Sequence, residues 1–291
     1  MAQLRDADLA LVFVGTTAGE GHDRPNLTLC ADCGQAGSCP AARAPDRPGG
    51  CWQDEMVAKV AVAARRTAVV VSTPGAVLLP WRDAVGAVLV AWLPGQEFGS
   101  AVADILYGTS SPSGKLPLTM PCFENQLNMS ALQYPGHMPN TSDPRRRKPD
   151  YANYTEKLEV GYRWFNAHGV QPAYSFGHGL SYTTFEFAGL RVAASGVSLM
   201  LTNNGTVPGA EVVQLYLDFP AAAGEPPNQL KGFQKVHLDA GASATVTIPL
   251  APRDFSVWSV EARGWVVAHG EFGVAVGSSS ADRRLVGKLT V

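Results

Sequence analysis

Two different hydrophobic patterns divide the chain. In the first half, continuous apolar runs at residues 9–14, 68–71 and 84–92 alternate with segments of helical spacing at 53–66 and 96–107. Continuous runs are typical of strands buried on both faces, and the alternation of strand and helix predicts a parallel sheet with right-handed crossovers. Such sheets bind ligands at the carboxyl ends of their strands.

The ends of the two helical segments are marked by charge and by glycine. Asp54 and Glu55 fall in the first turn of the first segment, and Arg65 and Arg66 fall in its last turn. This distribution suits the helix dipole. Gly108 follows the second segment and predicts a left-handed cap.

The second half consists of short segments in which apolar and polar residues alternate, separated by turns rich in Gly, Asn and Pro. The segments are 197–202, 211–218, 232–238, 244–250, 264–268 and 272–276. They predict an antiparallel β-sandwich of roughly 100 residues, close to an immunoglobulin domain in size. We expect Tyr182 and Thr183 to begin its first strand and the domain boundary to fall near residues 177–182.

Composition excludes several classes of function. Of 291 residues, 23 are basic and 25 are acidic, so the net charge of −2 creates no field that would recruit nucleic acid or an anionic membrane. The apolar run at 9–14 is too short for a signal peptide or a membrane span. We therefore expect a soluble chain that carries no signal peptide of its own. The basic run at 145–148 is interpreted as part of a solvated loop insertion.

Cysteines and glycosylation sequons indicate an oxidising environment. Four of the five cysteines (Cys30, Cys33, Cys39 and Cys51) lie in one segment, and Cys122 lies apart. The C-x2-C spacing resembles a zinc site, but the second pair is spaced differently and the loop holds no His, so we favour disulfides, for which three pairings are open. Sequons begin at Asn26, Asn128, Asn140, Asn153 and Asn204. We expect the parent protein to enter the secretory pathway and to be extracellular.

Candidate chemistry is concentrated in residues 15–24, directly after the first predicted strand. Three glycines permit tight turns there, and they surround a carboxylate, Glu20. A phosphate-binding loop is excluded because no Gly-Lys-Ser/Thr is present and Pro25 follows. A dinucleotide-binding site is excluded for the same reason. Asp23 and Arg24 can form an ion pair that fixes the shape of the loop. The residues alone leave open whether this loop is functional or only structural.

A family resemblance favours the functional interpretation. The sequence GEGHDR at 19–24, followed by Asn26-Leu27, resembles the loop of glycoside hydrolase family 3 that carries the general acid/base glutamate. Further similar blocks are PGQE at 94–97, PSGKLP at 112–117, GYRWF at 161–165, FGHGLSYT at 176–183 and GFQKV at 232–236. The resemblance implies a partial α/β sandwich domain at 1–160, a connecting segment at 161–181 and a fibronectin type III-like domain at 182–291.

The resemblance also implies a reaction. Family members hydrolyse β-glycosidic bonds with retention, in which one carboxyl protonates the leaving oxygen and a second one attacks the anomeric carbon. Glu20 is then the general acid/base, Asp23 and Arg24 shape its loop, and His22 lines the substrate site. The expected substrate is a β-linked oligosaccharide or an aryl glucoside, with no metal or cofactor.

This chain departs from the family pattern in one respect. Family members place an (α/β)8 barrel, which supplies the nucleophile, ahead of the sandwich domain. We therefore expect this chain to be a carboxy-terminal part that lacks the nucleophile and is inactive alone. Two alternatives remain: a β-xylosidase of the same family, or a non-catalytic carbohydrate-binding or interaction module.

Several aromatic residues and one histidine have simpler interpretations. Trp81 and Trp92 follow apolar runs and are expected to serve in packing. His178, between two glycines, is expected to be a hydrogen-bonded turn residue. If the sandwich binds glycans, the candidate aromatics are Phe219, Trp258 and Trp265.

Overall fold

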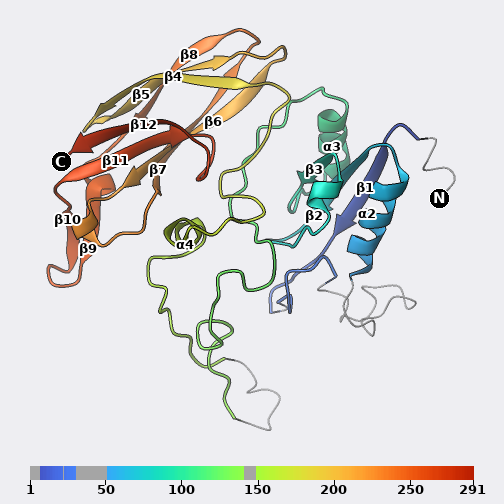
Figure 1. Cartoon of the computed structure of the whole chain (residues 1–291), viewed down its shortest axis with the longest axis horizontal. Helices are drawn as coiled ribbons and strands as arrows, with labels where there is room; N and C mark the ends of the chain where they lie inside the picture. Colours follow the sequence, from blue (N-terminus) through green and yellow to red (C-terminus); the bar gives the residue numbers. More distant parts are fainter. Residues whose placement is uncertain (1–6, 22, 31–50, 141–148) are drawn as a thin grey trace. The chain divides into compact units, whose positions relative to one another are not determined.

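The computed structural model describes residues 7–21, 23–30, 51–140 and 149–291. The chain divides into two compact units, the first formed by Met1–Ala101 with Met120–Gln126 and the second by Val102–Thr119 with Leu127–Val291. In chain order the elements are β1 (Ala10–Gly15), α2 (Trp52–Ala63), β2 (Thr67–Ser72), η2 (Arg82–Ala84), β3 (Ala87–Val90), α3 (Phe98–Leu106), α4 (Tyr162–His168), β4 (Phe185–Ala193), β5 (Gly196–Asn203), β6 (Gly209–Asp218), η4 (Ala221–Ala223), β7 (Gln229–Leu238), β8 (Ser243–Pro249), η5 (Pro252–Phe255), β9 (Ser256–Ser259), β10 (Gly264–Val267), β11 (Glu271–Gly277) and β12 (Arg283–Thr290), where η marks a 3-10 helix (Figure 1).

The first unit contains the predicted parallel sheet. Its strands are ordered β1-β2-β3, and helix α2 connects β1 to β2. Val12, Val69 and Val88 lie side by side in the parallel register. The α/β class expected from the alternation of apolar runs and helical segments is confirmed.

Burial differs between the strands of this sheet. In the central strand β2, Val69, Val70 and Val71 are all buried, as the continuous apolar run predicts. In β1, only alternate side chains are buried, and Leu11 and Phe13 are 43% and 54% exposed. The expectation that this strand is buried on both faces is wrong, because β1 lies at the edge of the described sheet and its successive side chains point to opposite faces.

Helix α2 ends earlier than its charges predict. Its last residue is Ala63, and Ala64 is already extended, with ψ 153°. Arg65 and Arg66 therefore lie beyond the helix, and the expectation that they occupy its last turn is wrong. The cause is the sheet: the carbonyl of Arg66 already accepts the backbone N–H of Ala10 in β1, at 2.9 Å. The cap after α3 is as predicted, because Gly108 has φ +76°.

The second unit contains the predicted β-sandwich. One sheet has the order β12-β11-β6-β7, the other has the order β4-β5-β8, and all pairs are antiparallel. The inward side chains of both sheets form one core, in which Leu199, Leu215 and Phe272 are almost completely buried. The first strand begins at Phe185, slightly later than expected, and strands β9 and β12 lie outside the predicted segments. Within the residues described, no helix has both the length and the apolar character that a membrane span requires.

Candidate active site

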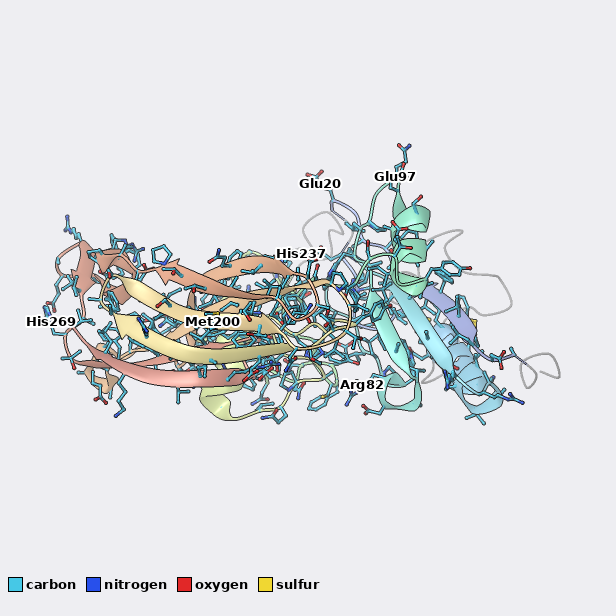
Figure 2. All side chains as sticks on the ribbon, turned by 90° about the horizontal axis from the view of Figure 1, so that it is seen from above. Glu20, Arg82, Glu97, Met200, His237 and His269 are labelled. Atoms are coloured by element: carbon cyan, nitrogen blue, oxygen red, sulfur yellow. A yellow bond between two sulfur atoms is a disulfide. The ribbon has the colours of Figure 1, made fainter. Side chains whose placement is uncertain are left out.

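Glu20 lies in an exposed turn just after β1. Figure 2 shows Glu20 and Glu97 at one end of the parallel sheet and Arg82 at the opposite end. Glu97 belongs to the loop that follows β3, so this end is the carboxyl edge of the sheet. The structure thus presents Glu20 to solvent at the edge where parallel sheets bind their ligands.

The base of the Glu20 loop is fixed by one buried amide, Gln53 in the first turn of α2. Its Oε1 accepts the N–H of Gly15 at 2.9 Å, and its Nε2 donates to the carbonyls of Gly15 and Leu29 at 2.8 and 2.9 Å. Gln53 is only 7% exposed. Because it binds the backbone where the loop leaves β1 and again at Leu29, it holds both ends of the loop. The role of Gln53 emerges only from the fold, since nothing in the sequence pattern around it distinguishes it from a surface glutamine.

A disulfide reinforces the same attachment. Cys30, directly after Leu29, is bonded to Cys51, the residue that precedes α2. The preference for disulfides over zinc is confirmed for this pair, whereas Cys33 and Cys39 lie outside the described residues. In the described part of the chain, no group of three or more His, Cys, Asp and Glu residues is arranged to hold a metal ion.

Arg24 fixes the far side of the loop. Its guanidinium donates to the carbonyl of Ala76 at 2.8 Å, in the segment after β2. Leu27 adds a backbone bond, because its carbonyl accepts the N–H of Leu78 at 2.8 Å. Asp23 is exposed, and His22 lies outside the described residues. Of the predicted loop-shaping residues, Arg24 thus has a visible anchoring contact.

Chemically, this arrangement offers a carboxyl group in water on an anchored loop. An exposed carboxyl can exchange protons with a bound substrate and with solvent, which a general acid/base requires. Retaining hydrolysis needs a second carboxyl roughly 5 Å away. Glu97, the other labelled acid at this edge, is also exposed, and its Oε2 lies 3.5 Å from the hydroxyl of Ser100.

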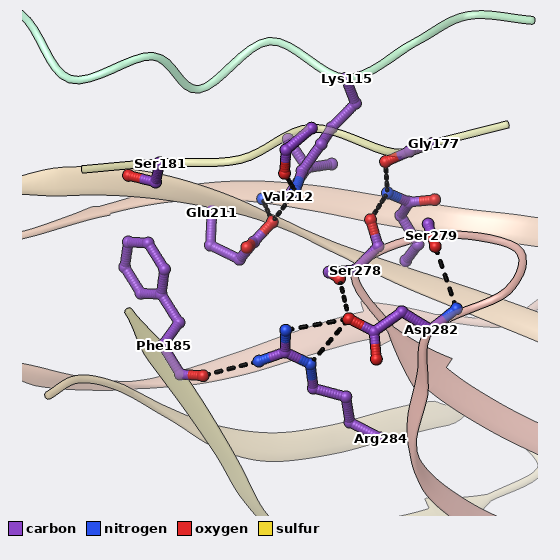
Figure 3. A network of polar contacts seen from close by, with 12 residues as sticks. Lys115, Gly177, Ser181, Phe185, Glu211, Val212, Ser278, Ser279, Asp282 and Arg284 are labelled. Carbon is purple, nitrogen blue, oxygen red and sulfur yellow. Dashed lines mark hydrogen bonds and ion pairs between the residues drawn. The ribbon is translucent and has the colours of Figure 1, made fainter. Parts of the chain in front are cut away.

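The blocks PSGKLP and FGHGLSYT meet in the second unit. The Nζ of Lys115 lies 2.7 Å from Oε1 of Glu211 in β6 and donates to the carbonyl of Gly179 at 2.8 Å. Figure 3 shows this ion pair beside a second group of contacts around Asp282. Gln214 Nε2 donates to the carbonyls of Gly177 and Ser278. These contacts fasten both blocks to the β-sandwich.

His178 lies inside this network as a turn residue, as predicted. Its backbone N–H donates to the carbonyl of Ser175, its ring stacks on Tyr174, and the preceding Gly177 has φ +79°. Burial lowers the pKa of His178, and the Lys115 charge lowers it further, while Asp282 opposes the shift. The folded environment therefore favours the neutral imidazole of His178.

Trp81 is confirmed as a packing residue. It is 4% exposed, and its indole N–H donates to Oδ1 of Asp54 at 2.7 Å. Burial raises the pKa of this carboxyl, and the hydrogen bond from Trp81 partly offsets the rise. Trp92 is half-buried, and its carbonyl accepts the hydroxyl of Ser72.

An anchored glutamate at the carboxyl edge of an α/β sheet, followed along the chain by an antiparallel β-sandwich, is the arrangement that the family resemblance implies. Residues 1–182 match the glycosyl hydrolase family 3 C-terminal domain, and residues 211–280 match the fibronectin type III-like domain. The chain belongs to glycosyl hydrolase family 3.

Similar proteins are β-glucosidases by name. The chain is 39% identical to probable beta-glucosidase D of Aspergillus flavus over 97% of its own length. It resembles the structure of DesR, a beta-glucosidase from Streptomyces venezuelae in complex with D-glucose, with TM-score 0.84 and 34% identity over 100% of the chain. The beta-D-glucoside glucohydrolase of Trichoderma reesei gives TM-score 0.79 and 33% identity, also over 100% of the chain.

The chain spans little more than a third of these relatives. It covers 36% of the Aspergillus protein, 34% of the Streptomyces protein and 41% of the Trichoderma protein. The expected family and fold class are confirmed by these matches.

Proposed function

We propose that this chain provides the general acid/base, Glu20, for hydrolysis of β-glucosides by a family 3 enzyme. The observation that carries the proposal is the exposed position of Glu20 on a loop anchored by Gln53 and Arg24 at the carboxyl edge of the sheet. The names of the relatives support glucose as the sugar.

The proposed reaction has two steps. First, protonated Glu20 donates its proton to the glycosidic oxygen, while a second carboxylate displaces the alcohol and forms a glycosyl-enzyme ester. Glu20, now ionised, then removes a proton from water, whose oxygen attacks the anomeric carbon and releases the second carboxylate. We assign the second carboxylate to the (α/β)8 barrel domain that family members place ahead of the α/β sandwich domain. Asp23 and Arg24 keep the Glu20 loop in shape, and His22 lines the sugar site.

A hybrid enzyme tests the role of Glu20. The matching segment of the Trichoderma protein is replaced by this chain, and hydrolysis of 4-nitrophenyl β-glucoside and of cellobiose is measured for the hybrid, for its Glu20→Gln variant and for the chain alone. The chain alone should be inactive, and the hybrid should be active. Glu20→Gln should lose about a hundredfold or more, and the loss should be greater for cellobiose, whose leaving group needs the proton more.

Control variants make the result specific. Glu97→Gln changes an exposed carboxyl at the same edge and should retain most of the activity. Circular dichroism and thermal unfolding establish that each hybrid is folded. Full activity of a folded Glu20→Gln hybrid would refute the assignment, and normal turnover by the chain alone would refute the need for a barrel. A β-xylosidase would be revealed by preference for 4-nitrophenyl β-xyloside.

We also propose that the parent protein is a secreted glycoprotein. All five sequon asparagines (Asn26, Asn128, Asn140, Asn153 and Asn204) are exposed. The disulfide Cys30–Cys51 belongs to an oxidising compartment. Expression through the secretory pathway of a yeast should give a product whose mass falls on endoglycosidase treatment, and an unchanged mass would contradict the proposal.

A further inference from the structure

The ribbon formed by β9 and β10 exposes two tryptophans side by side. Trp258 and Trp265 are directly opposite in the antiparallel register, so both point to the same face of the ribbon. Their ring centroids are 5.4 Å apart at an interplanar angle of 70°, and they are 53% and 50% exposed. Four other aromatic rings in the strands of the sandwich are buried, by contrast: those of Phe185, Phe187, Tyr216 and Phe272. These indoles are therefore a surface feature and contribute little to the core.

The base of the ribbon packs against the sandwich core. Phe255, just before β9, is buried in the sandwich core, and Val267 and Ala268, at the end of β10, pack against the same core. Two strands of four residues would be marginal alone, but this base fixes them. The tryptophan face thus has a defined shape before anything binds to it.

The charge around the tryptophans points to a neutral ligand. Between residues 253 and 267 the ribbon carries two arginines and two acids, Arg253 and Arg263 against Asp254 and Glu261. The guanidinium of Arg253 lies 2.8 Å from the ring centre of Trp265, and Asp254 accepts the N–H of Ala251. A balanced surface of this kind does not attract a polyanion. The guanidinium covers one face of Trp265, so a ligand would meet Trp258 and the part of Trp265 that remains exposed. Exposed indoles combine an apolar ring with a polar N–H, which suits a ligand with C–H faces and hydroxyl groups, a carbohydrate.

We propose that Trp258 and Trp265, which belong to the second unit, form a carbohydrate-binding surface for an extended β-glucan chain. An exposed ribbon, unlike an enclosed pocket, accommodates a chain that continues in both directions. The choice of a β-linked glucan rests on the proposed function, whereas the surface itself does not. Phe219, the third aromatic candidate, has no part in it, because its half-buried ring packs against Phe272 in the core.

Binding to the unmodified full chain tests the proposal. Cellohexaose and laminarin are titrated by calorimetry, and migration is compared in native gels with and without embedded β-glucan. The chain should bind at least one glucan. Trp258→Ala and Trp265→Ala should each weaken binding about tenfold or more, as tryptophans at the centre of a binding surface do. Trp258→Phe keeps an aromatic ring and should lose less affinity for the glucan. This variant provides a second measurement if either alanine variant misfolds.

Two controls separate this surface from other sites. Phe233 in β7 is 66% exposed in the same sandwich, and Phe233→Ala should leave binding unchanged. Glu20→Gln should also bind normally, so failure of the catalytic assignment and failure of this proposal are distinguishable. Absence of glucan binding, or equal binding by the tryptophan variants, would overturn the proposal. Concentration-dependent self-association that is lost in those variants would identify a second copy of the chain as the occupant and would overturn it too.

Discussion

Removing the positive charge of Lys115 should destabilise the second unit strongly. The Lys115 and Glu211 side chains are 11% and 8% exposed, and their charged atoms are 2.7 Å apart. In the variant Lys115→Met, the Glu211 carboxylate keeps the N–H of Val212 at 2.7 Å but loses its counter-ion. A buried charge left without its partner costs about 3–5 kcal/mol of unfolding free energy.

The expected size of the effect can be bounded by two comparisons within the chain. Lys288 and Glu271 are also 2.7 Å apart, but their side chains are 72% and 58% exposed. Lys288→Met should cost at most about 1 kcal/mol, because water screens this pair. The double variant Lys115→Met with Glu211→Leu removes both buried charges and should recover most of the lost stability.

Urea unfolding followed by circular dichroism and tryptophan fluorescence measures these differences. The midpoint for Lys115→Met should fall clearly below that for Lys288→Met, and the double variant should lie near the unmodified chain. If Lys115→Met and Lys288→Met shifted the midpoint equally, the buried pair would have no special energetic role. If the double variant were worse than either single substitution, the cost would arise from packing and not from an uncompensated charge.

Three further predictions concern other parts of the chain. The pKa of His178 is lowered in the folded state, so the unfolded chain takes up a proton before the folded chain does as the pH falls below about 6.5. The free energy of unfolding should therefore decline as the pH falls through that range. The variant His178→Gln should flatten this part of the curve of unfolding midpoint against pH. Replacing Cys30 and Cys51 by Ser opens a covalent loop with a sequence separation of 21 residues and should lower the free energy of unfolding by about 3 kcal/mol in urea unfolding. The unmodified chain in reductant should unfold at the same urea concentration as this variant. Gln53→Leu removes three hydrogen bonds at the base of the Glu20 loop and should lower stability by more than about 2 kcal/mol and raise amide exchange at Gly15; unchanged exchange would show that the loop does not depend on Gln53.

Sequence patterns predicted the order of elements well because the apolar runs and turn residues are local signals. The central strand β2 and most strands of the sandwich were found in this way, whereas β9 and β12 were not. The exposure of Leu11 and Phe13 could not be predicted, because an apolar run does not reveal which face of a strand is covered. The early end of α2 was equally hidden, since it depends on the bond between Arg66 and the neighbouring strand.

The candidate site was predictable only in part. The loop that carries Glu20 was identified from its motif, but its attachments join residues far apart in sequence. Arg24 reaches Ala76, and Gln53 reaches back to Gly15, contacts that require the fold to be known. The pairing of Cys30 with Cys51 was one of three possibilities that spacing could not separate.

The attachment of the Glu20 loop to α2 uses two kinds of chemistry. The disulfide yields to thiols, whereas the Gln53 hydrogen bonds do not respond to redox conditions. In a reducing compartment the chain would thus lose the disulfide at Cys30 and keep the hydrogen bond from Gln53 to Leu29. Folding of this loop onto α2 and its covalent locking are therefore separable, because the hydrogen bonds can form in either redox state and the disulfide adds to them only after oxidation.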